Sequence, residues 1–403
     1  MIVYGLVLEG GGARGAYHIG ACKALQELGV EIGAITGTSI GALNGAMIVQ
    51  GEVGKAYEMW ANISPSQVVD VDEERLNELR EMRFNTSHLP YYMKRFTEIV
   101  GEGGVDISPL RTLLNENIDE EKIRQSKIDL GIVTVSISDL KPLELFVKDI
   151  PEGHLVDYLV ASAAFPGFKM ERMDGKRFID GGFHDNLPIN MLLGKGYTEI
   201  IVVRTYGPGR HRRVDRKGLT IHTIAPGEDL GGIMDFDRAR ANKNLQMGYF
   251  DTLKVFQGLA GNRYYLIPDR EEEYFLEILM HLPKEKVCYI GSLLGFKELP
   301  YRRMLFEQII PRLTDMLNIE RHADYREISL LLLEQVAHRY QVDRFKIYTI
   351  DEFIAAVKHH YIPHRGRVRL GLPALLKRTR IAPLAAREEI FNELVYQLFE
   401  EIL

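Results

Sequence analysis

This 403-residue chain has few cysteines, no excess of basic charge and no long hydrophobic run. Cys22 and Cys288 are its only cysteines, and their separation fits neither a disulfide framework nor a zinc site. The chain has 50 Lys and Arg residues and 56 Asp and Glu residues, so its net charge is negative. This balance excludes a general nucleic-acid-binding surface. With 46% hydrophobic and 26% charged residues, the chain is an ordinary globular protein. Its cysteine usage is typical of a reducing compartment, so we expect a cytoplasmic protein.

Two segments imitate membrane elements without meeting their requirements. Residues 1–8 are apolar, but no basic residue precedes them and Glu9 follows too soon for a targeting segment. Residues 32–51 carry no charge and contain glycines spaced four apart, as in a membrane helix pair. The Thr, Ser, Asn and Gln residues among them leave too little apolar character to cross a bilayer. Any membrane contact is therefore expected to be peripheral.

Strand and helix patterns alternate through the first two thirds of the chain. Residues 2–8 and 32–35 are strand-like, whereas residues 16–28 and 40–49 have helical spacing. This alternation predicts an α/β fold in three layers, with a central, mostly parallel sheet between helices. Further strands are predicted at 129–136, 143–147, 176–179, 199–204, 219–224 and 263–267.

Changes in this pattern predict two domains. Residues of about 60–128 are polar and helical, which indicates an insertion that caps the sheet edge. After Pro268 the apolar spacing becomes helical throughout. We therefore expect an α/β domain at 1–268 and a helical C-terminal domain at 269–403. No oligomeric state follows from these patterns.

The first predicted strand runs into a glycine-rich loop and then a helix. Gly10, Gly12 and Gly15 satisfy the spacing of a dinucleotide-binding fingerprint. However, the second strand ends in Thr36 and Gly37, where that fold places an acidic residue. The loop also lacks the Lys-Ser/Thr pair of a nucleotide-phosphate loop. What remains is a row of backbone N–H groups at a helix N-terminus, which binds an oxyanion as readily as a phosphate.

A GxSxG motif follows the second strand, with Ser39 between Gly37 and Gly41. A serine placed between a strand and a helix occupies a sharp turn, and small neighbours allow the backbones to approach. Such a serine is a candidate nucleophile, although a tight turn capped by serine is the structural alternative. A nucleophilic serine needs a base.

Histidine is the usual base, and His184, His211 and His222 lie downstream of Ser39. None of them lies in a recognisable loop context. A second candidate is Asp180, at the end of the predicted strand 176–179 and before Gly181 and Gly182. By itself an Asp-Gly-Gly turn is weak evidence, because such turns are common.

Taken together, these motifs resemble the patatin-like phospholipases, serine acyl hydrolases that use a Ser-Asp dyad. The resemblance covers residues of about 2–268 and rests on four segments in matching order. They are GGGARG at 10–15, GTSIG at 37–41, ASAAFPG at 161–167, and DGG at 180–182 followed by NLP at 186–188. The family often has Asp before the triple glycine, where this chain has Glu9. The helical tail is outside the resemblance.

The resemblance implies roles for individual residues. Ser39 corresponds to the nucleophile, Asp180 to its base, and Gly10, Gly11 and Gly12 to the oxyanion loop. Residues that support these motifs are Arg14, Gly15, Gly37, Gly41, Gly181 and Gly182. The implied activity is hydrolysis of carboxylic esters of lipids, of the phospholipase A or lysophospholipase type. No metal or organic cofactor is implied, and the expected partner is a lipid ester.

Two other functions remain open from the sequence. An acyltransferase would share the same acyl-enzyme and differ in whether water or another alcohol releases the acyl group. A non-catalytic lipid-binding protein would tolerate a broken motif. Here the glycine loop, the GxSxG motif and the Asp-Gly-Gly turn are all intact.

Two basic stretches provide a hypothesis for contact with an anionic membrane. Residues 210–217 hold five Lys or Arg residues against Asp215, and residues 358–380 hold seven and no acid. Such stretches attract anionic lipid if nearby acids do not neutralise them.

Overall fold

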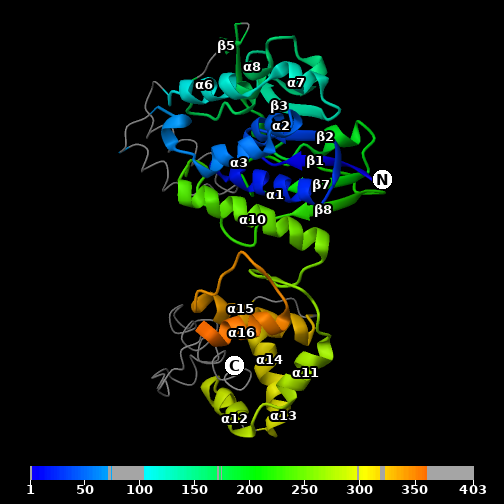
Figure 1. Ribbon diagram of the computed structural model, residues 1–403, viewed down its shortest axis with the longest axis vertical. Coiled ribbons are helices and arrows are strands. Elements are labelled where there is room, and N and C mark those ends of the chain that lie inside the picture. Colours follow the sequence, from blue (N-terminus) through cyan, green and yellow to red (C-terminus); the bar gives the residue numbers. More distant parts are fainter. Residues whose placement is uncertain are drawn as a thin grey trace. The chain divides into compact units, whose positions relative to one another are not determined.

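A computed structural model describes residues 2–70, 74, 104–169, 172–173, 175–296, 299–317 and 323–360. The chain forms two compact units, residues 1–257 and 258–403 (Figure 1). The division precedes Pro268, and the predicted limit of the hydrolase domain at 268 stays a prediction. Much of the predicted insertion at 60–128, most of the basic stretch 358–380 and the end of the predicted helical domain, residues 361–403, lie outside the described residues.

The first unit alternates strands and helices. Its strands are β1 (Val3–Leu8), β2 (Glu31–Thr38), β3 (Asp129–Ser136), β4 (Lys141–Phe146), β5 (Arg172–Met173), β6 (Lys176–Asp180), β7 (Glu199–Val203) and β8 (Thr220–Ile224). Its α-helices are α1 (Ala16–Glu27), α2 (Ile40–Val49), α3 (Val53–Ala61), α6 (Ser108–Asn117), α7 (Glu120–Gln125), α8 (Leu155–Ser162), α9 (Ile189–Leu193) and α10 (Arg238–Gln257). Short 3₁₀ turns are η1 (Gly12–Gly15), η2 (Pro65–Gln67), η4 (Val147–Asp149) and η5 (Gly181–Phe183).

These strands form one mixed sheet in the order β5-β6-β3-β2-β1-β7-β8, with β4 also paired to β3. Strands β3, β2, β1, β7 and β8 run parallel to one another. Strands β4 and β6 run antiparallel to β3, and β5 antiparallel to β6. The predicted α/β fold with a mostly parallel sheet is confirmed.

Helices cover both faces of this sheet because its central strands are apolar on both sides. On one face, Gly45 brings α2 against Leu8, Ile35 and Leu130. On the other, the side chains of Val7, Ala34, Ile200 and Val202 pack with Ile189 and Leu192 from α9. The layered arrangement expected from the sequence is therefore present around the centre of the sheet.

Strands β2 and β6 meet end to end along one edge of β3. The last residue of β2, Thr38, lies opposite Val133 of β3. The last residue of β6, Asp180, lies opposite the next residue of β3, Thr134. Because β2 is parallel and β6 antiparallel to β3, their carboxyl ends point at each other. The other edge of β3 is occupied by β4. Whatever follows β2 is thus placed beside the last residue of β6.

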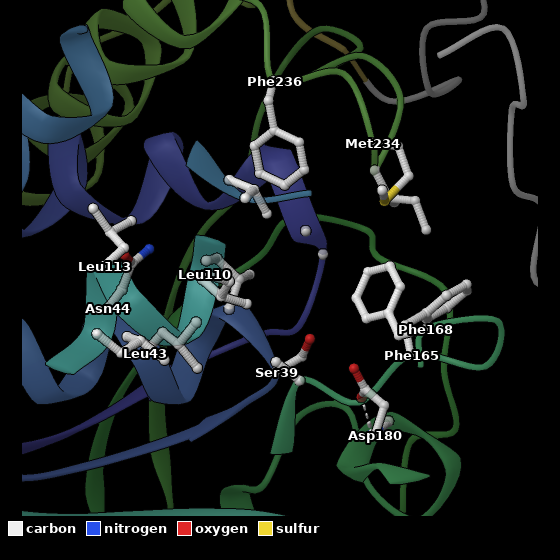
Figure 2. Close-up of a pocket in the computed structure, with 18 of the residues that line it drawn as sticks. Ser39, Leu43, Asn44, Leu110, Leu113, Phe165, Phe168, Asp180, Met234 and Phe236 are labelled. Atoms are coloured by element: carbon white, nitrogen blue, oxygen red, sulfur yellow. Dashed lines mark hydrogen bonds between the residues drawn. The ribbon is translucent and has the colours of Figure 1, made fainter. Parts of the chain in front are cut away.

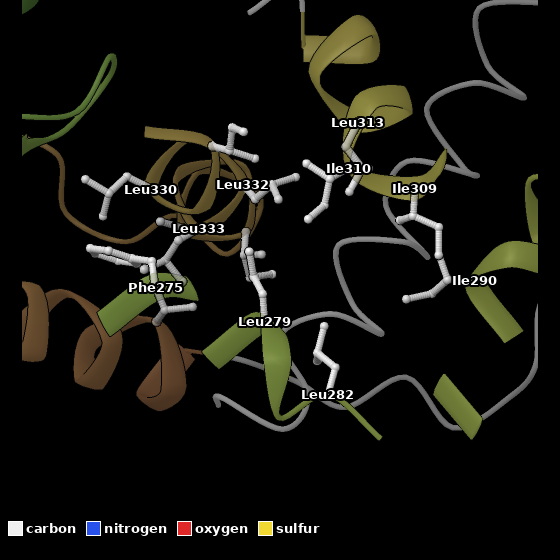
Figure 3. Packing of buried hydrophobic residues seen from close by; sticks show 14 of the residues in the cluster. Phe275, Leu279, Leu282, Ile290, Ile309, Ile310, Leu313, Leu330, Leu332 and Leu333 are labelled. Carbon is white, nitrogen blue, oxygen red and sulfur yellow. The ribbon is translucent and has the colours of Figure 1, made fainter. Parts of the chain in front are cut away.

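The second unit consists mainly of helices around one apolar core (Figure 3). Its elements are β9 (Tyr265–Leu266), α11 (Glu272–Met280), α12 (Lys284–Leu293), α13 (Tyr301–Met304), the π-helix η6 (Leu305–Ile309), α14 (Ile310–Leu317), α15 (Tyr325–Arg339), β10 (Ile347–Tyr348) and α16 (Ile350–His360). The core contains Phe275, Leu279, Ile290, Leu313 and Leu333 among others.

One predicted strand belongs to a different sheet than expected. Residues 263–267 were predicted as a strand of the α/β domain, but β9 pairs in parallel with β10 in the second unit. A buried carboxylate explains this placement, since Glu334 on α15 accepts hydrogen bonds from the backbone N–H groups of Asn262, Arg263 and Tyr264. The tail therefore includes a short two-stranded sheet beside its helices.

Candidate active site

Ser39 occupies the turn between β2 and α2 with a backbone that few residues adopt. Its φ is 55° and its ψ is −128°, in the region that normally favours glycine. The turn is tight enough that a Cβ on Gly37 would overlap the backbone of Gly41, and one on Gly41 would overlap that of Leu8. The two glycines predicted to support the motif are therefore required by close packing. From this turn Ser39 lines the adjoining pocket.

Asp180 lies opposite this turn, at the end of β6. Figure 2 shows the Ser39 hydroxyl and the Asp180 carboxyl directed toward each other. Asp180 is only 5% exposed, and its carboxylate accepts a hydrogen bond of 2.8 Å from the N–H of Gly182. Burial raises the pKa of Asp180 to about 6, although hydrogen bonds from Gly182 and the Ser39 side chain act to lower it. The pair thus combines a hydroxyl with a carboxylate that is more basic than usual.

The backbone N–H groups of the glycine loop differ in whether they already have a hydrogen-bond partner. The N–H of Gly10 donates to the carbonyl of Asn186 at 3.2 Å and is thereby occupied. Gly11 and Gly12 line the pocket beside Ser39. Among the described residues, the N–H groups of Gly11 and Gly12 find no hydrogen-bond partner. Of the three predicted oxyanion donors, only Gly11 and Gly12 are therefore available in this conformation.

Glu9 and Arg14 fix the two ends of this loop. Glu9 is fully buried and binds Arg204, His211 and the N–H groups of Thr205 and Tyr206. Burial acts to raise the pKa of Glu9, but hydrogen bonds from His211 and Arg204 outweigh it and the pKa is lowered. It is therefore an anionic anchor for the segment after β7.

Arg14 lies on the other side of the loop and supports its shape. Its guanidinium donates to the carbonyls of Gly231, Thr205 and Tyr206 at 2.8, 3.2 and 2.6 Å. Burial lowers its pKa, although Asp229 and Glu9 act in the opposite direction. Arg14 is not among the residues that line the pocket. These contacts favour the supporting role that the resemblance implies for Arg14.

Two residues at the site were not singled out from the sequence. The hydroxyl of Ser162 accepts a 3.0 Å hydrogen bond from the N–H of Ser39 and donates to the carbonyl of Val133 at 2.7 Å. The side chain of Asn186 donates to the carbonyls of Gly10 and Gly207. Both belong to the family segments ASAAFPG and NLP, so their place in those segments was the available signal.

The histidines considered as bases are engaged elsewhere. His184 lies 3.0 Å from Glu144, His211 lies 3.0 Å from Glu9, and His222 lies 3.7 Å from Glu199. No histidine of the described residues lines the pocket. The geometry therefore favours Asp180 over histidine as the partner of Ser39.

The pocket that contains Ser39 and Asp180 is predominantly apolar. Leu43, Leu110 and Leu113 lie to one side of Ser39, Phe165, Phe168 and Met234 lie to the other, and Phe236 lies above it (Figure 2). An apolar cavity with a few convergent polar groups is the usual form of a small-molecule site. The arrangement suits a ligand that is largely hydrocarbon and carries one reactive polar group.

The part of the chain that the structure describes contains neither a metal-binding cluster nor a membrane-spanning helix. No cluster of three or more His, Cys, Asp or Glu residues there is arranged to hold a metal ion. Within the same residues, no helix combines the length and apolar character needed to cross a membrane.

This geometry defines an α/β protein with a serine on a strained strand-to-helix turn. Comparisons with known proteins relate much of this part of the chain to one family. The family model for patatin-like phospholipase matches residues 6–193. Neuropathy target esterase sws of Drosophila melanogaster is 29% identical over 212 residues, which cover 49% of this chain and 12% of the relative. Patatin-like phospholipase domain-containing protein 6 of Homo sapiens is 26% identical over 201 residues, which cover 49% and 13% respectively.

Among solved structures, VipD from Legionella pneumophila has a TM-score of 0.40 and 14% identity, with 98% of this chain and 92% of that chain covered. The family assignment rests on the family model and the curated relatives. Residues 6–193 form a patatin-like phospholipase domain. This chain spans only a small part of the length of the curated relatives that it matches.

Proposed function

We propose that this protein is a serine acyl hydrolase that cleaves carboxylic ester bonds of lipids. The observation that carries the proposal is the strained Ser39 facing the buried Asp180 inside an apolar pocket. The family match over residues 6–193 supports it independently. Phospholipase A and lysophospholipase activities are the two forms we propose.

In the proposed reaction, Ser39 Oγ attacks the ester carbonyl while Asp180 accepts the hydroxyl proton. The negative charge that develops on the carbonyl oxygen is stabilised by the N–H groups of Gly11 and Gly12. Loss of one such donor typically costs about 3 to 4 kcal/mol of transition-state stabilisation. Asp180 then gives its proton to the leaving alcohol, and water repeats the cycle on the acyl-enzyme.

The mismatch between a carboxylate and a serine hydroxyl is the main difficulty of this chemistry. It is reduced because burial raises the pKa of Asp180 to about 6. Charge on the oxyanion is also formed next to donors that need no reorganisation, which makes them more effective than water.

A lipid panel tests the proposal directly. The full chain is incubated with phospholipids, lysophospholipids and neutral esters, and released fatty acid is measured by mass spectrometry. We expect fatty acid release, together with stoichiometric labelling of Ser39 by an organophosphonate located by peptide mapping. Label on another residue, or release without any label, would contradict the assignment. Transfer of the acyl group to an added alcohol in preference to water would identify an acyltransferase.

We also propose peripheral contact with an anionic membrane beside the pocket. Tyr206 is 55% exposed, and its φ of 50° is held by hydrogen bonds to Glu9 and Arg14. Pro208 and Gly209 follow and line the pocket, and the exposed basic stretch 210–217 comes next. An exposed aromatic ring beside basic side chains is favourable at a lipid interface.

Nearby acids neutralise only part of this stretch. Arg212 pairs with Glu144, and Asp215 lies within the stretch itself. Arg213, Arg216 and Lys217 are exposed. Each cation near an anionic surface contributes about 1 kcal/mol at low salt.

Cosedimentation with vesicles tests this contact. Reversing Arg213, Arg216 and Lys217 to Glu is expected to lower binding to phosphatidylglycerol-containing vesicles at least about tenfold at low salt. The matched control reverses the exposed Lys55, Lys127 and Lys148, which changes the net charge equally. Equal loss in both triple variants, or binding indifferent to salt, would contradict a local contact at 210–217.

A further inference from the structure

Three helices present matching apolar stripes to the pocket. In each helix the lining residues are spaced by three, four and seven positions, which places them on one face. The stripes are Ile40, Leu43, Asn44 and Met47 from α2; Ala56, Met59, Trp60 and Ile63 from α3 and its end; and Leu110, Leu113, Leu114 and Asn117 from α6. The part of the pocket that leads from Ser39 along α2 is therefore a slot walled by helix faces, which we call the acyl slot.

The polar side chains in these walls are satisfied by each other and by backbone. The indole N–H of Trp60 donates to Asn44 Oδ1 at 3.0 Å, and Asn44 Nδ2 donates to the carbonyl of Gly15 at 2.8 Å. Asn117 Nδ2 donates to the carbonyl of Leu113 at 2.7 Å. Because these groups are engaged, the slot favours hydrocarbon over a polar ligand.

A hydrogen-bonded bridge ties the walls together at the end far from Ser39. Gln50 follows α2, and its Nε2 donates to the carbonyl of Asn117 at 2.8 Å. Its Oε1 accepts from the N–H of Asp119 at 3.0 Å. Met47, one turn before Gln50, lies within 3.5 Å of the same Nε2 through its sulfur. Met47 and Asn117 therefore mark the level at which α2 and α6 are held together.

The distance from Ser39 to this level sets a length. Met47 is eight residues after Ser39, which immediately precedes α2, and at about 1.5 Å per residue this separation is about 12 Å. An extended hydrocarbon chain with bonds of about 1.5 Å advances about 1.3 Å per carbon, so about nine carbons span this distance.

From this geometry we infer that the acyl slot binds one acyl chain of about eight to ten carbons, with Met47 and Asn117 limiting its length. The inference rests on the proposed function, since it places the ester carbonyl at Ser39. A shorter chain leaves apolar wall uncovered, and each methylene that is not buried lowers kcat/KM about fourfold. A chain longer than the slot must displace Met47 or leave the slot, and turnover falls.

A series of p-nitrophenyl esters from four to sixteen carbons tests the length limit on the full chain. We expect kcat/KM to rise to a maximum at about eight to ten carbons and then to fall. Met47→Ala removes the side chain at the end of the slot and makes room for about two methylenes. It should raise the kcat/KM ratio of the twelve-carbon to the eight-carbon ester about tenfold. Met47→Trp should lower the same ratio.

The ratio is measured within each variant, so a reduced folded fraction cancels. Met191→Ala is the matched control, because Met191 and Met47 are each 6% exposed but Met191 does not line the pocket. Its chain-length profile should equal that of wild type. Ester hydrolysis with a profile that Met47→Ala leaves unchanged overturns the slot while the proposed function stands. Absence of both hydrolysis and phosphonate labelling overturns the proposed function and the slot with it.

Discussion

Replacing Ser39 by alanine is expected to lower kcat/KM for lipid esters by at least about 10⁴-fold. The nucleophile carries the whole covalent pathway, and its loss leaves only binding and the oxyanion donors. Alanine keeps the Cβ of serine, so the strained backbone at φ 55° costs the same in both proteins. The fold should therefore survive. Hydrolysis is measured with the best ester of the panel, and folding by circular dichroism and thermal unfolding.

A matched control tests whether the loss of activity is specific to Ser39 or follows from any serine-to-alanine replacement. Ser292 is exposed on α12 in the second unit, and Ser292→Ala should retain wild-type turnover. Ser39→Ala protein that keeps more than a hundredth of wild-type activity, or that still reacts with the phosphonate, would show that another residue is the nucleophile.

Asp180→Asn is expected to lower kcat/KM by about 10² to 10⁴-fold, the usual contribution of a general base. The amide has the shape of the carboxyl and still accepts the hydrogen bond from Gly182, but it does not accept the Ser39 proton. Stability should not fall. Burial raises the pKa of Asp180 in the folded protein, so ionisation of this carboxyl opposes folding as pH rises from its ordinary pKa through about 6. The neutral amide removes that penalty at neutral pH.

The pH profile provides the second readout of the same variant. A base must be deprotonated to act, so wild-type kcat/KM should fall as pH drops through about 6. The residual activity of Asp180→Asn should lack this acidic limb. A variant that turns over near the wild-type rate, or that keeps the limb at about 6, would exclude Asp180 as the base. In that case the limb would belong to a group outside the pocket lining, because no other acid and no histidine of the described residues lines the pocket.

Much of the first unit could be predicted from the sequence because its signals are local. Strand β3 and helix α2 have the bounds expected from the pattern, residues 129–136 and 40–49. Apolar runs and helical spacing act over a few residues, so they survive in the folded protein. Strand β2 is longer than expected, since its pairing with β3 continues through Gly37 to Thr38. Pairing across a sheet overrides the weak strand preference of glycine.

Predictions that depend on distant partners were less complete. Residues 263–267 look like another strand of the sheet, yet β9 pairs with β10, and only Tyr265 and Leu266 are in it. Gly10 looks equivalent to Gly11 and Gly12 as a donor, yet its N–H is taken by Asn186, far along the chain. Neither partner is visible in local spacing.

The sequence by itself determined the motifs, the alternation of strands and helices, and the candidates Ser39 and Asp180. Tertiary structure decided that these two side chains meet, because β2 and β6 approach each other head to head on one edge of β3. It also decided the basicity of Asp180 and the apolar slot, since burial and the facing of α2, α3 and α6 arise only when the layers pack. The physical reason is that these two kinds of interaction act over different separations along the chain. Backbone preferences and residue spacing act between neighbours, whereas desolvation and cavity shape depend on side chains more than a hundred residues apart.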